Sequence, residues 1–413
     1  MADTHAKDCR VLVVQNGARH NYAVPQALAG AGMLAGFYTD ACGNEGLGRC
    51  LSWLSSLGSK ARLLKNRSVP QSVLPFTHSF PLATATDHLL NSGTTFTPQS
   101  RTLGLAMTLA GDCGANMIYS SLGWSTHFLA RAKSRGLTVV TEFYVRPSLW
   151  RVHQEEYLQF PEWEEVMPYA NVEESTEEGL ALRDYSDHLL VPAQGVKNDI
   201  VNEGLFDASR IHIVPYGIGQ EFFDIENRPV PGRVLFVGSC TLVKGIHCLA
   251  LASEIVAKLP GSVSPEFIAA GEVTERVRQH PACSQVKFLG RVPRMEVNRL
   301  YADADVLVFP TLSDAFGMVM LEAMAAGIPV ICSPYCGEVV EHGVSGLVVY
   351  PSDSERLADA IHTIINDRPL RTQMSEAAKV RAHQFTTEAN ARLLTSTLRD
   401  IHKSGQPAAS AKV

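Results

Sequence analysis

The 413-residue sequence has no apolar run long enough to cross a bilayer as a helix, although 46% of its residues are hydrophobic. Its start, MADTHAKDCR, lacks the basic-then-apolar layout of a secretory signal peptide. Its nine cysteines show no CxxC spacing, and no His-rich motif stands beside the closest pair, Cys332 and Cys336. These absences predict a cytoplasmic protein with reduced thiols and no metal site, rather than a membrane-spanning or disulfide-stapled one.

Positive charge and glycine fingerprints are also scarce. The formal net charge of −6 argues against a nucleic-acid binder. The first apolar strand pattern, Arg10 to Gln15, is not followed by G-x-G-x-x-G, so a dinucleotide cofactor is not expected. We find no internal repeat. The length allows two or three globular domains with ample core.

The most informative stretch runs from Val306 to Cys332, VLVFPTLSDAFGMVMLEAMAAGIPVIC. It reads as a buried strand, a short loop, a helix that starts near Gly317 and is closed by Gly327, and a second buried strand. This is the pattern of a βαβ unit. Its loop lies at the carboxyl end of a strand, where open α/β sheets bind ligands.

The loop of this unit has the chemistry of an anion or sugar site. Amides at a helix start are unpaired donors that carry the positive end of the helix dipole, here those of Phe316, Gly317, Met318 and Val319. Asp314 and Glu322 bracket the stretch, and a carboxylate at Glu322 can accept two hydrogen bonds from a ribose diol. The plainer alternatives are that Asp314 only caps the helix and that Glu322 lies on an amphipathic surface.

The whole string resembles the E-x7-E signature of retaining GT-B glycosyltransferases, in particular glycosyltransferase family 4, with Asp314 in place of the usual first Glu. The resemblance implies an α/β GT-B fold with two Rossmann-like domains facing a cleft. It implies that the first acid and the following amides hold the donor sugar and that Glu322 holds the nucleotide ribose. We expect the donor to be a nucleotide-diphosphate sugar.

The resemblance also divides the chain. Residues 1–217 would form the acceptor-side domain and end in the landmark Pro215-Tyr216-Gly217. Residues 218–385 would form the nucleotide-sugar-binding domain. The apolar stripe Leu394, Leu398 and Ile401 predicts that a helix within 386–403 crosses back onto the N-terminal domain. Residues 404–413 are expected to be a disordered tail.

Two N-terminal loops carry candidate site residues. Gly17 matches the family's glycine-bearing loop that faces the donor diphosphate, and Arg19 and His20 follow as polar partners, although His20 suits an ordinary surface position equally. After the strand pattern Leu137 to Thr141, many relatives place a catalytic histidine. Here Glu142 and Phe143 stand instead, so Glu142 is the polar candidate, with a structural salt bridge as its alternative.

Further donor contacts are implied in the C-terminal half. The loop Gly238 to Gly245 follows a strand, and its Lys244 matches the lysine of a family Arg–Lys pair that clamps the diphosphate, while Ser239 stands where the arginine usually is. Arg291 or Arg19 could supply the missing cation. Arg291 and Val292 also match a family loop whose backbone reads the nucleobase. In the resembling family transfer needs neither a metal nor a cofactor.

Two regions contain charged residues of mainly one sign, and each can be interpreted as an ordinary solvated surface. From 49 to 67 every charged residue is positive and the apolar residues have helical spacing, which suits either peripheral contact with the anionic inner membrane surface or, as favoured here, a core-facing stripe with solvated charges. From Glu155 to Glu178 there are nine glutamates and no Lys or Arg, which predicts a solvated helical face and loop.

The expected function is retaining transfer of a sugar to a hydroxyl of a glycan, lipid-linked sugar or small molecule, as in glycan biosynthesis. Lys244, Asp314, Glu142 and His20 are the catalytic candidates. The alternatives are a non-catalytic nucleotide-sugar-binding subunit and another GT-B enzyme such as an epimerase. A GT-B phosphorylase is disfavoured because no pyridoxal-phosphate lysine motif is present.

Overall fold

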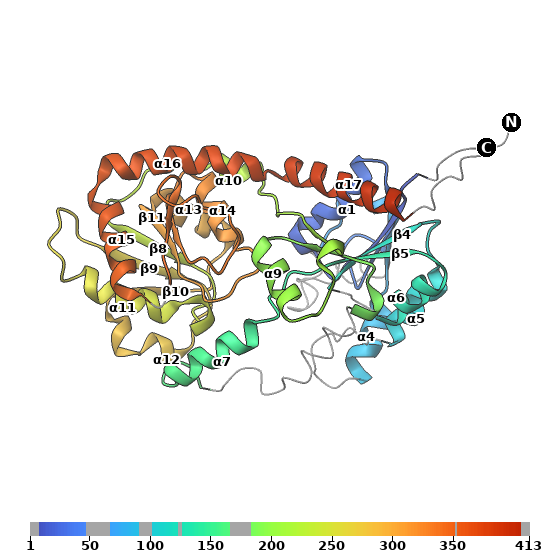
Figure 1. Ribbon diagram of the computed structural model, residues 1–413, viewed down its shortest axis with the longest axis horizontal. Helices are drawn as coiled ribbons and strands as arrows, with labels where there is room; N and C mark the ends of the chain where they lie inside the picture. The colour runs from blue at the N-terminus through green and yellow to red at the C-terminus, as the bar shows by residue number, and fades with distance from the viewer. Residues whose placement is uncertain are drawn as a thin grey trace.

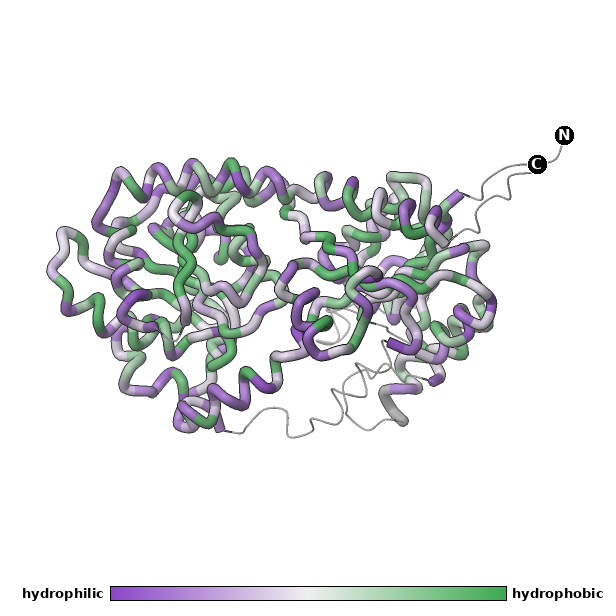
Figure 2. The backbone as a smooth tube through the Cα atoms, viewed as in Figure 1, coloured by the Kyte–Doolittle hydropathy of each residue, from purple (hydrophilic) through white to green (hydrophobic). Residues whose placement is uncertain are grey.

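The computed structural model describes residues 8–46, 67–90, 101–122, 126–165, 183–351 and 353–405, with the backbone alone for residues 88–90. The chain forms two domains side by side, each built on a parallel sheet with helices on both faces (Figure 1). The predicted α/β architecture of two Rossmann-like domains is therefore confirmed. Hydrophobic residues follow the central strands, whereas hydrophobic and hydrophilic residues alternate along the outer helices (Figure 2).

The N-terminal sheet has the order β3-β2-β1-β4-β5-β6-β7. Its strands are β1 (Val11–Val14), β2 (Leu34–Thr39), β3 (Thr77–Ser79), β4 (Met117–Ser121), β5 (Thr138–Glu142), β6 (His188–Val191) and β7 (Ile211–Ile213). All neighbours pair in parallel; Val11 of β1, for example, faces Met117 of β4. The central strand β1 is a continuous buried apolar run because helices cover both faces of the sheet.

The helices of this half begin with the 3-10 turn η1 (Arg19–Tyr22) and α1 (Ala23–Gly30). The others are η2 (Leu74–Phe76), α4 (Pro81–Leu90), α5 (Arg101–Ala110), α6 (Thr126–Ser134), α7 (Leu149–Gln159), α9 (Gln194–Asn202) and η3 (Ala208–Arg210). None of the helices in the described part of the chain combines the length and the hydropathy that a membrane span requires. Residues 49–66 of the basic stretch lie outside the described residues, and its last member, Arg67, pairs with Asp40 at 2.6 Å.

The C-terminal sheet has the order β10-β9-β8-β11-β12-β13. Its strands are β8 (Arg233–Val237), β9 (Glu266–Ala270), β10 (Val286–Gly290), β11 (Val306–Phe309), β12 (Val330–Cys332) and β13 (Gly346–Val348). Its helices are α10 (Gln220–Phe223), η4 (Leu242–Lys244), α11 (Ile246–Val256), α12 (Glu275–Arg278), η5 (Pro281–Gln285), α13 (Arg294–Asp303), α14 (Met318–Ala325), α15 (Ser354–Asn366), α16 (Arg368–Ala382) and η6 (His383–Phe385). The predicted βαβ unit is β11-α14-β12.

The last helix, α17 (Thr387–Ser404), returns to the N-terminal domain and lies along α1 (Figure 1). Its stripe of Leu394, Leu398 and Ile401 is buried in the same core cluster as Val11 and Leu28. The final helix thus packs against the N-terminal domain. The crossing point is tied by hydrogen bonds between Ile218, in the linker, and Phe385 and Thr387.

A second crossing was not expected. Helix α7 follows the N-terminal strand β5, yet it lies beneath the C-terminal domain (Figure 1). Trp163, just after it, is only 2% exposed and belongs to the core cluster that includes Val234 and Leu249. The expectation that the glutamate-rich stretch forms only a solvated face is therefore wrong for Glu156 and Glu164, whose carboxylates bond to groups of the C-terminal domain.

Candidate functional site

Lys244 and Asp314, which are 70 positions apart in the sequence, form an ion pair in the structure. Lys244 ends η4 in the loop after β8, and Asp314 lies in the loop after β11, the neighbouring strand. The Lys244 Nζ is 2.6 Å from Asp314 Oδ2 and donates at 3.3 Å to the carbonyl of Ser313. The carboxyl ends of adjacent parallel strands thus bring one cation and one anion to the same edge of the sheet.

The other oxygen of Asp314 shapes the start of α14. Asp314 Oδ1 accepts from the amide of Phe316 at 2.9 Å. This differs from the expectation in two ways, because Phe316 already has an acceptor and because the N-cap of α14 is Gly317 rather than Asp314. The amides of Gly317, Met318 and Val319 lie at the start of the helix, where an amide has no acceptor within the helix itself.

Gly317 is required by the backbone. Its φ is +79°, a left-handed conformation, and an added Cβ would lie 2.8 Å from Met320 Cε and 2.9 Å from Phe309 Cε1. A side chain here would force the loop away from β11. The glycine therefore maintains the close approach of the helix start to the sheet.

Glu322 lies one turn into α14, where its Oε2 accepts from the hydroxyl of Tyr301 at 2.8 Å. Burial raises the pKa of Glu322 despite this hydrogen bond. Tyr301 comes from α13 and is fully buried. Sequence reasoning missed Tyr301, because nothing in a helical tyrosine signals which carboxylate it faces. Glu322 is not the simple surface residue of the alternative interpretation.

The remaining C-terminal candidates surround this pair more loosely. Ser239 is exposed at the start of the loop after β8, and Val292 is half-buried after β10. Arg291 pairs with Glu272, and both side chains are exposed, at 77% and 61%. The Arg291 guanidinium is therefore paired with Glu272 at the surface.

Glu142 lies at the carboxyl end of β5 in a buried polar cluster. Its carboxylate accepts from Arg19 Nη2 at 3.0 Å, from Tyr216 at 2.7 Å and from Tyr119 at 2.8 Å. Burial alone would favour the neutral acid, but the Arg19 charge and these hydrogen bonds hold the pKa of Glu142 below its ordinary value. A buried carboxylate this fully occupied corresponds to the structural salt bridge that was the alternative.

His20 lies beside this cluster rather than on the surface. Its ring centroid is 4.3 Å from that of Tyr216, and its buried Nε2 has no hydrogen-bond partner among the described residues. Burial, followed by the charge of Arg19, lowers the pKa of His20 to about 4. His20 is therefore a neutral imidazole near pH 7.

Gly17 precedes the η1 turn, and its amide already has a hydrogen-bond acceptor. It donates to Asp40 Oδ1 at 3.0 Å, and Asp40 is itself paired with Arg67. The bond ties the loop after β1 to the end of β2. Asp40 was not identified from the sequence, because an aspartate after a strand has no feature that names its partner.

Tyr216 connects the two halves of the site. Its hydroxyl bonds to Arg19 and Glu142, while its ring meets Phe316 edge-on at 5.3 Å between centroids. A cavity opens on the N-terminal side of this contact. It is lined by His20, Ala23, Val24, Tyr119, Glu142, Leu190, Val191, Pro192, Val214, Tyr216, Gly217, Thr387, Asn390 and Leu394.

Known proteins show the same two-domain arrangement. The Anabaena protein HepE, crystallised with UDP and glucose, has a TM-score of 0.65 at 16% identity and covers 95% of this chain and 100% of its own. Sucrose-phosphate synthase of Thermosynechococcus elongatus has a TM-score of 0.65 at 17% identity and covers 96% and 99%. At these identities the likeness shows the fold, which is that of GT-B glycosyltransferases.

Sequence relatives align over only part of this chain. An uncharacterized glycosyltransferase of Methanocaldococcus jannaschii is 35% identical over 154 residues, 35% of this chain and 39% of that protein. The sulfoquinovosyl transferase of Arabidopsis thaliana is 26% identical over 221 residues, 49% of this chain and 42% of that protein. The chain thus spans less than half the length of these curated relatives. Residues 219–381 match the family described as glycosyl transferases group 1. The C-terminal domain is therefore similar to glycosyl transferases group 1, within a chain of GT-B fold.

Proposed function

We propose that this protein transfers a sugar from a nucleotide-diphosphate sugar to an acceptor hydroxyl with retention of anomeric configuration. The observation that carries the proposal is the pair of Lys244 and Asp314 beside the start of α14. One cation, one carboxylate and the first amides of a helix suit a diphosphate joined to a sugar. Relatives that bear the name glycosyltransferase, and a fold neighbour crystallised with UDP and glucose, agree with this choice of donor.

Each residue then has a separable task. Lys244 would turn from Asp314 to the diphosphate and neutralise charge as the leaving group departs. Asp314, released from one partner, would accept from the sugar hydroxyls. Glu322 would accept from the ribose, in place of or together with Tyr301. The chain's own residues would hold the donor without a metal.

The chemistry of the acceptor step follows from the state of Glu142. Because Glu142 already accepts from three donors, it is poorly placed to take a proton from an acceptor hydroxyl. The proton would pass to the leaving diphosphate oxygen on the same face of the sugar, which is the route that preserves configuration. His20 and Glu142 would then shape the N-terminal side of the cleft rather than react.

A second candidate function is donor binding without turnover. Ser239, where an arginine would complete the clamp, is exposed and uncharged, and Arg291 is paired with Glu272. A binding-only protein would hold a nucleotide sugar but would not release nucleoside diphosphate from it.

The test uses UDP-glucose, GDP-mannose and ADP-glucose as probes, with released nucleoside diphosphate as the readout and water as the default acceptor. We expect one of them to turn over. Lys244→Ala should lower that rate about 10²–10³-fold, as loss of a donor to a developing anion does. Lys258→Ala is the matched control, because Lys258 is an exposed lysine just after α11. It should leave the rate unchanged. Equal rates in wild type and Lys244→Ala would contradict the assignment.

A further inference from the structure

Helix α7 is attached to the C-terminal domain by polar contacts as well as by Trp163. Glu164 Oε1 accepts from the amide of Leu242 at 2.8 Å, and Leu242 begins the η4 turn that carries Lys244. The segment after β5 therefore lies directly behind the loop that holds the proposed diphosphate cation. Another contact of this segment is a group of side chains between α7 and α11.

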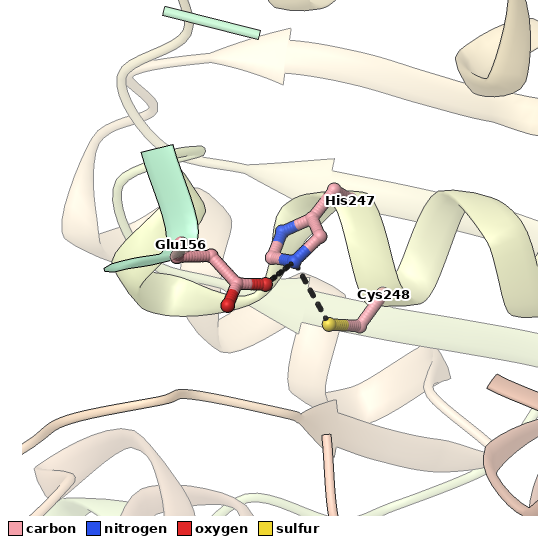
Figure 3. Close-up of side chains that lie close together, drawn as sticks. All are labelled: Glu156, His247 and Cys248. Carbon is pink, nitrogen blue, oxygen red and sulfur yellow. Dashed lines mark hydrogen bonds and ion pairs between the residues drawn. The ribbon is translucent and has the colours of Figure 1, made fainter. Parts of the chain in front are cut away.

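Three different metal-ligand types converge at this contact (Figure 3). Glu156 comes from α7, and His247 and Cys248 come from the first turn of α11. His247 Nε2 is 2.5 Å from Glu156 Oε1 and 3.3 Å from Cys248 Sγ. The three candidate ligand atoms all lie within 4.8 Å of one another.

The cluster is buried on two sides and reachable on the third. The side chains of His247 and Glu156 are 1% and 14% exposed, and Cys248 is 3% exposed. Glu156 therefore marks the side from which an ion in water could enter. Oxygen, nitrogen and sulfur ligands that are held inside a protein are the set that Zn²⁺ accepts.

Hydrogen bonding alone explains this geometry poorly. A single ring nitrogen, Nε2, faces both a carboxylate and a thiol, yet it has room for one proton. With that proton present, the short contact to Glu156 is satisfied and no other acceptor for the thiol hydrogen is found among the described residues. Without it, the Nε2 lone pair faces a carboxylate at close range. His247 Nδ1 has no hydrogen-bond partner in the part of the chain that the structure describes.

We propose that Glu156, His247 and Cys248 bind one Zn²⁺ that joins α7 to α11. A divalent cation would be attracted to all three atoms at once and would balance one carboxylate and one thiolate in a buried place. Three protein ligands leave one tetrahedral position for water. This site is separate from the proposed sugar transfer, which needs no metal at the donor, and it departs from the expectation of a chain without a metal site.

The experiment uses the full chain, stripped with a chelator and then titrated with Zn²⁺ or Co²⁺. We expect one Zn²⁺ per chain to survive dialysis, and Co²⁺ to produce the near-ultraviolet charge-transfer absorption of a cobalt–thiolate bond. Cys248→Ala should abolish that absorption and weaken binding at least about tenfold. Cys283→Ala removes another buried thiol of the same core cluster and should change neither.

Glu156→Gln covers the case in which Cys248→Ala fails to fold, because Glu156 is nearer the surface. It should keep the thiolate absorption while weakening Co²⁺ about tenfold or more. Two results would overturn the proposal. One is less than stoichiometric Zn²⁺ after dialysis of the folded wild type. The other is cobalt–thiolate absorption that Cys248→Ala leaves as strong as in wild type, or a Co²⁺ affinity that Glu156→Gln leaves unchanged.

Discussion

At the scale of single residues, the two acids that bracket α14 have different partners and therefore different expected effects. Asp314 touches Lys244 and the helix start, whereas Glu322 is deeper and holds Tyr301. The diphosphate and ribose are present in donor and product alike. The sugar is present only in the donor. Substitutions of the two acids should therefore have different effects on the affinities for the intact donor and for the free nucleotide.

Glu322→Ala should weaken an NDP-sugar and the free nucleoside diphosphate together, by about tenfold or more, since a lost hydrogen bond to a charged group costs roughly 1.5–3 kcal/mol. Asp314→Ala should weaken binding of the intact donor but not of the free nucleotide, because Asp314 no longer competes with the diphosphate for Lys244. Isothermal calorimetry of both variants with UDP and UDP-glucose measures this. If Asp314→Ala harms UDP binding as much as Glu322→Ala does, the two roles are wrong.

His20 predicts a dependence of stability on pH. Burial lowers its pKa from 6.5 to about 4, so between these values the unfolded chain binds a proton that the folded chain does not. Stability contributed by neutral His20 is present above pH 6.5 and is lost as pH falls toward 4, by on the order of 2–3 kcal/mol. Urea unfolding of wild type and His20→Asn at several pH values measures this. Parallel curves for the two proteins would refute it.

At the scale of elements, α17 is the clearest case of a helix stabilised by one face. Leu398 is fully buried against the N-terminal core, while Leu393 on the same helix is 41% exposed. Leu398→Ala should lower the free energy of unfolding by about 2–5 kcal/mol, because it removes buried methyl groups and leaves a cavity. Leu393→Ala, measured in the same urea titrations, should change it little. Similar losses for both variants would show that α17 is not anchored by this stripe.

At the scale of the whole molecule, polar contacts join the two domains in addition to the ring contact of Tyr216 with Phe316. Glu338 of the C-terminal domain accepts from the amides of Gln194 and Gly195, at 3.2 and 3.0 Å, and so caps α9 of the other domain. A carboxylate at a helix start is favoured by the dipole as well as by these bonds.

Glu338→Ala should therefore weaken the contact between the domains. It should lower the free energy of unfolding by about 0.5–2 kcal/mol, the range for lost helix caps. Small-angle scattering should show a larger radius of gyration for this variant. Glu341→Ala is the control, because Glu341 pairs with Arg381 inside the C-terminal domain. An unchanged scattering profile for Glu338→Ala would mean that the capping bond does not hold the domains together.

The sequence by itself determined the elements and their class. The apolar run of Val306 to Phe309 became β11, the helix after Gly317 became α14, and the stripe of Leu394 and Leu398 became the buried face of α17. Periodicity is local information, because each residue's burial depends on the repeat of its own helix or strand. The motif of Asp314 and Glu322 was readable for the same reason, since its residues lie within one βαβ unit.

Only the tertiary structure decided which side chains meet. The partners of Glu142, Gly17 and Glu322 are remote in sequence, and no spacing names them. Glu156 and Glu164 looked like members of a solvated acidic run, yet the crossing of α7 places one against His247 and the other on η4. A residue's partner depends on how strands are ordered and where connections cross, and that order is fixed by the packing of the whole chain rather than by any local pattern.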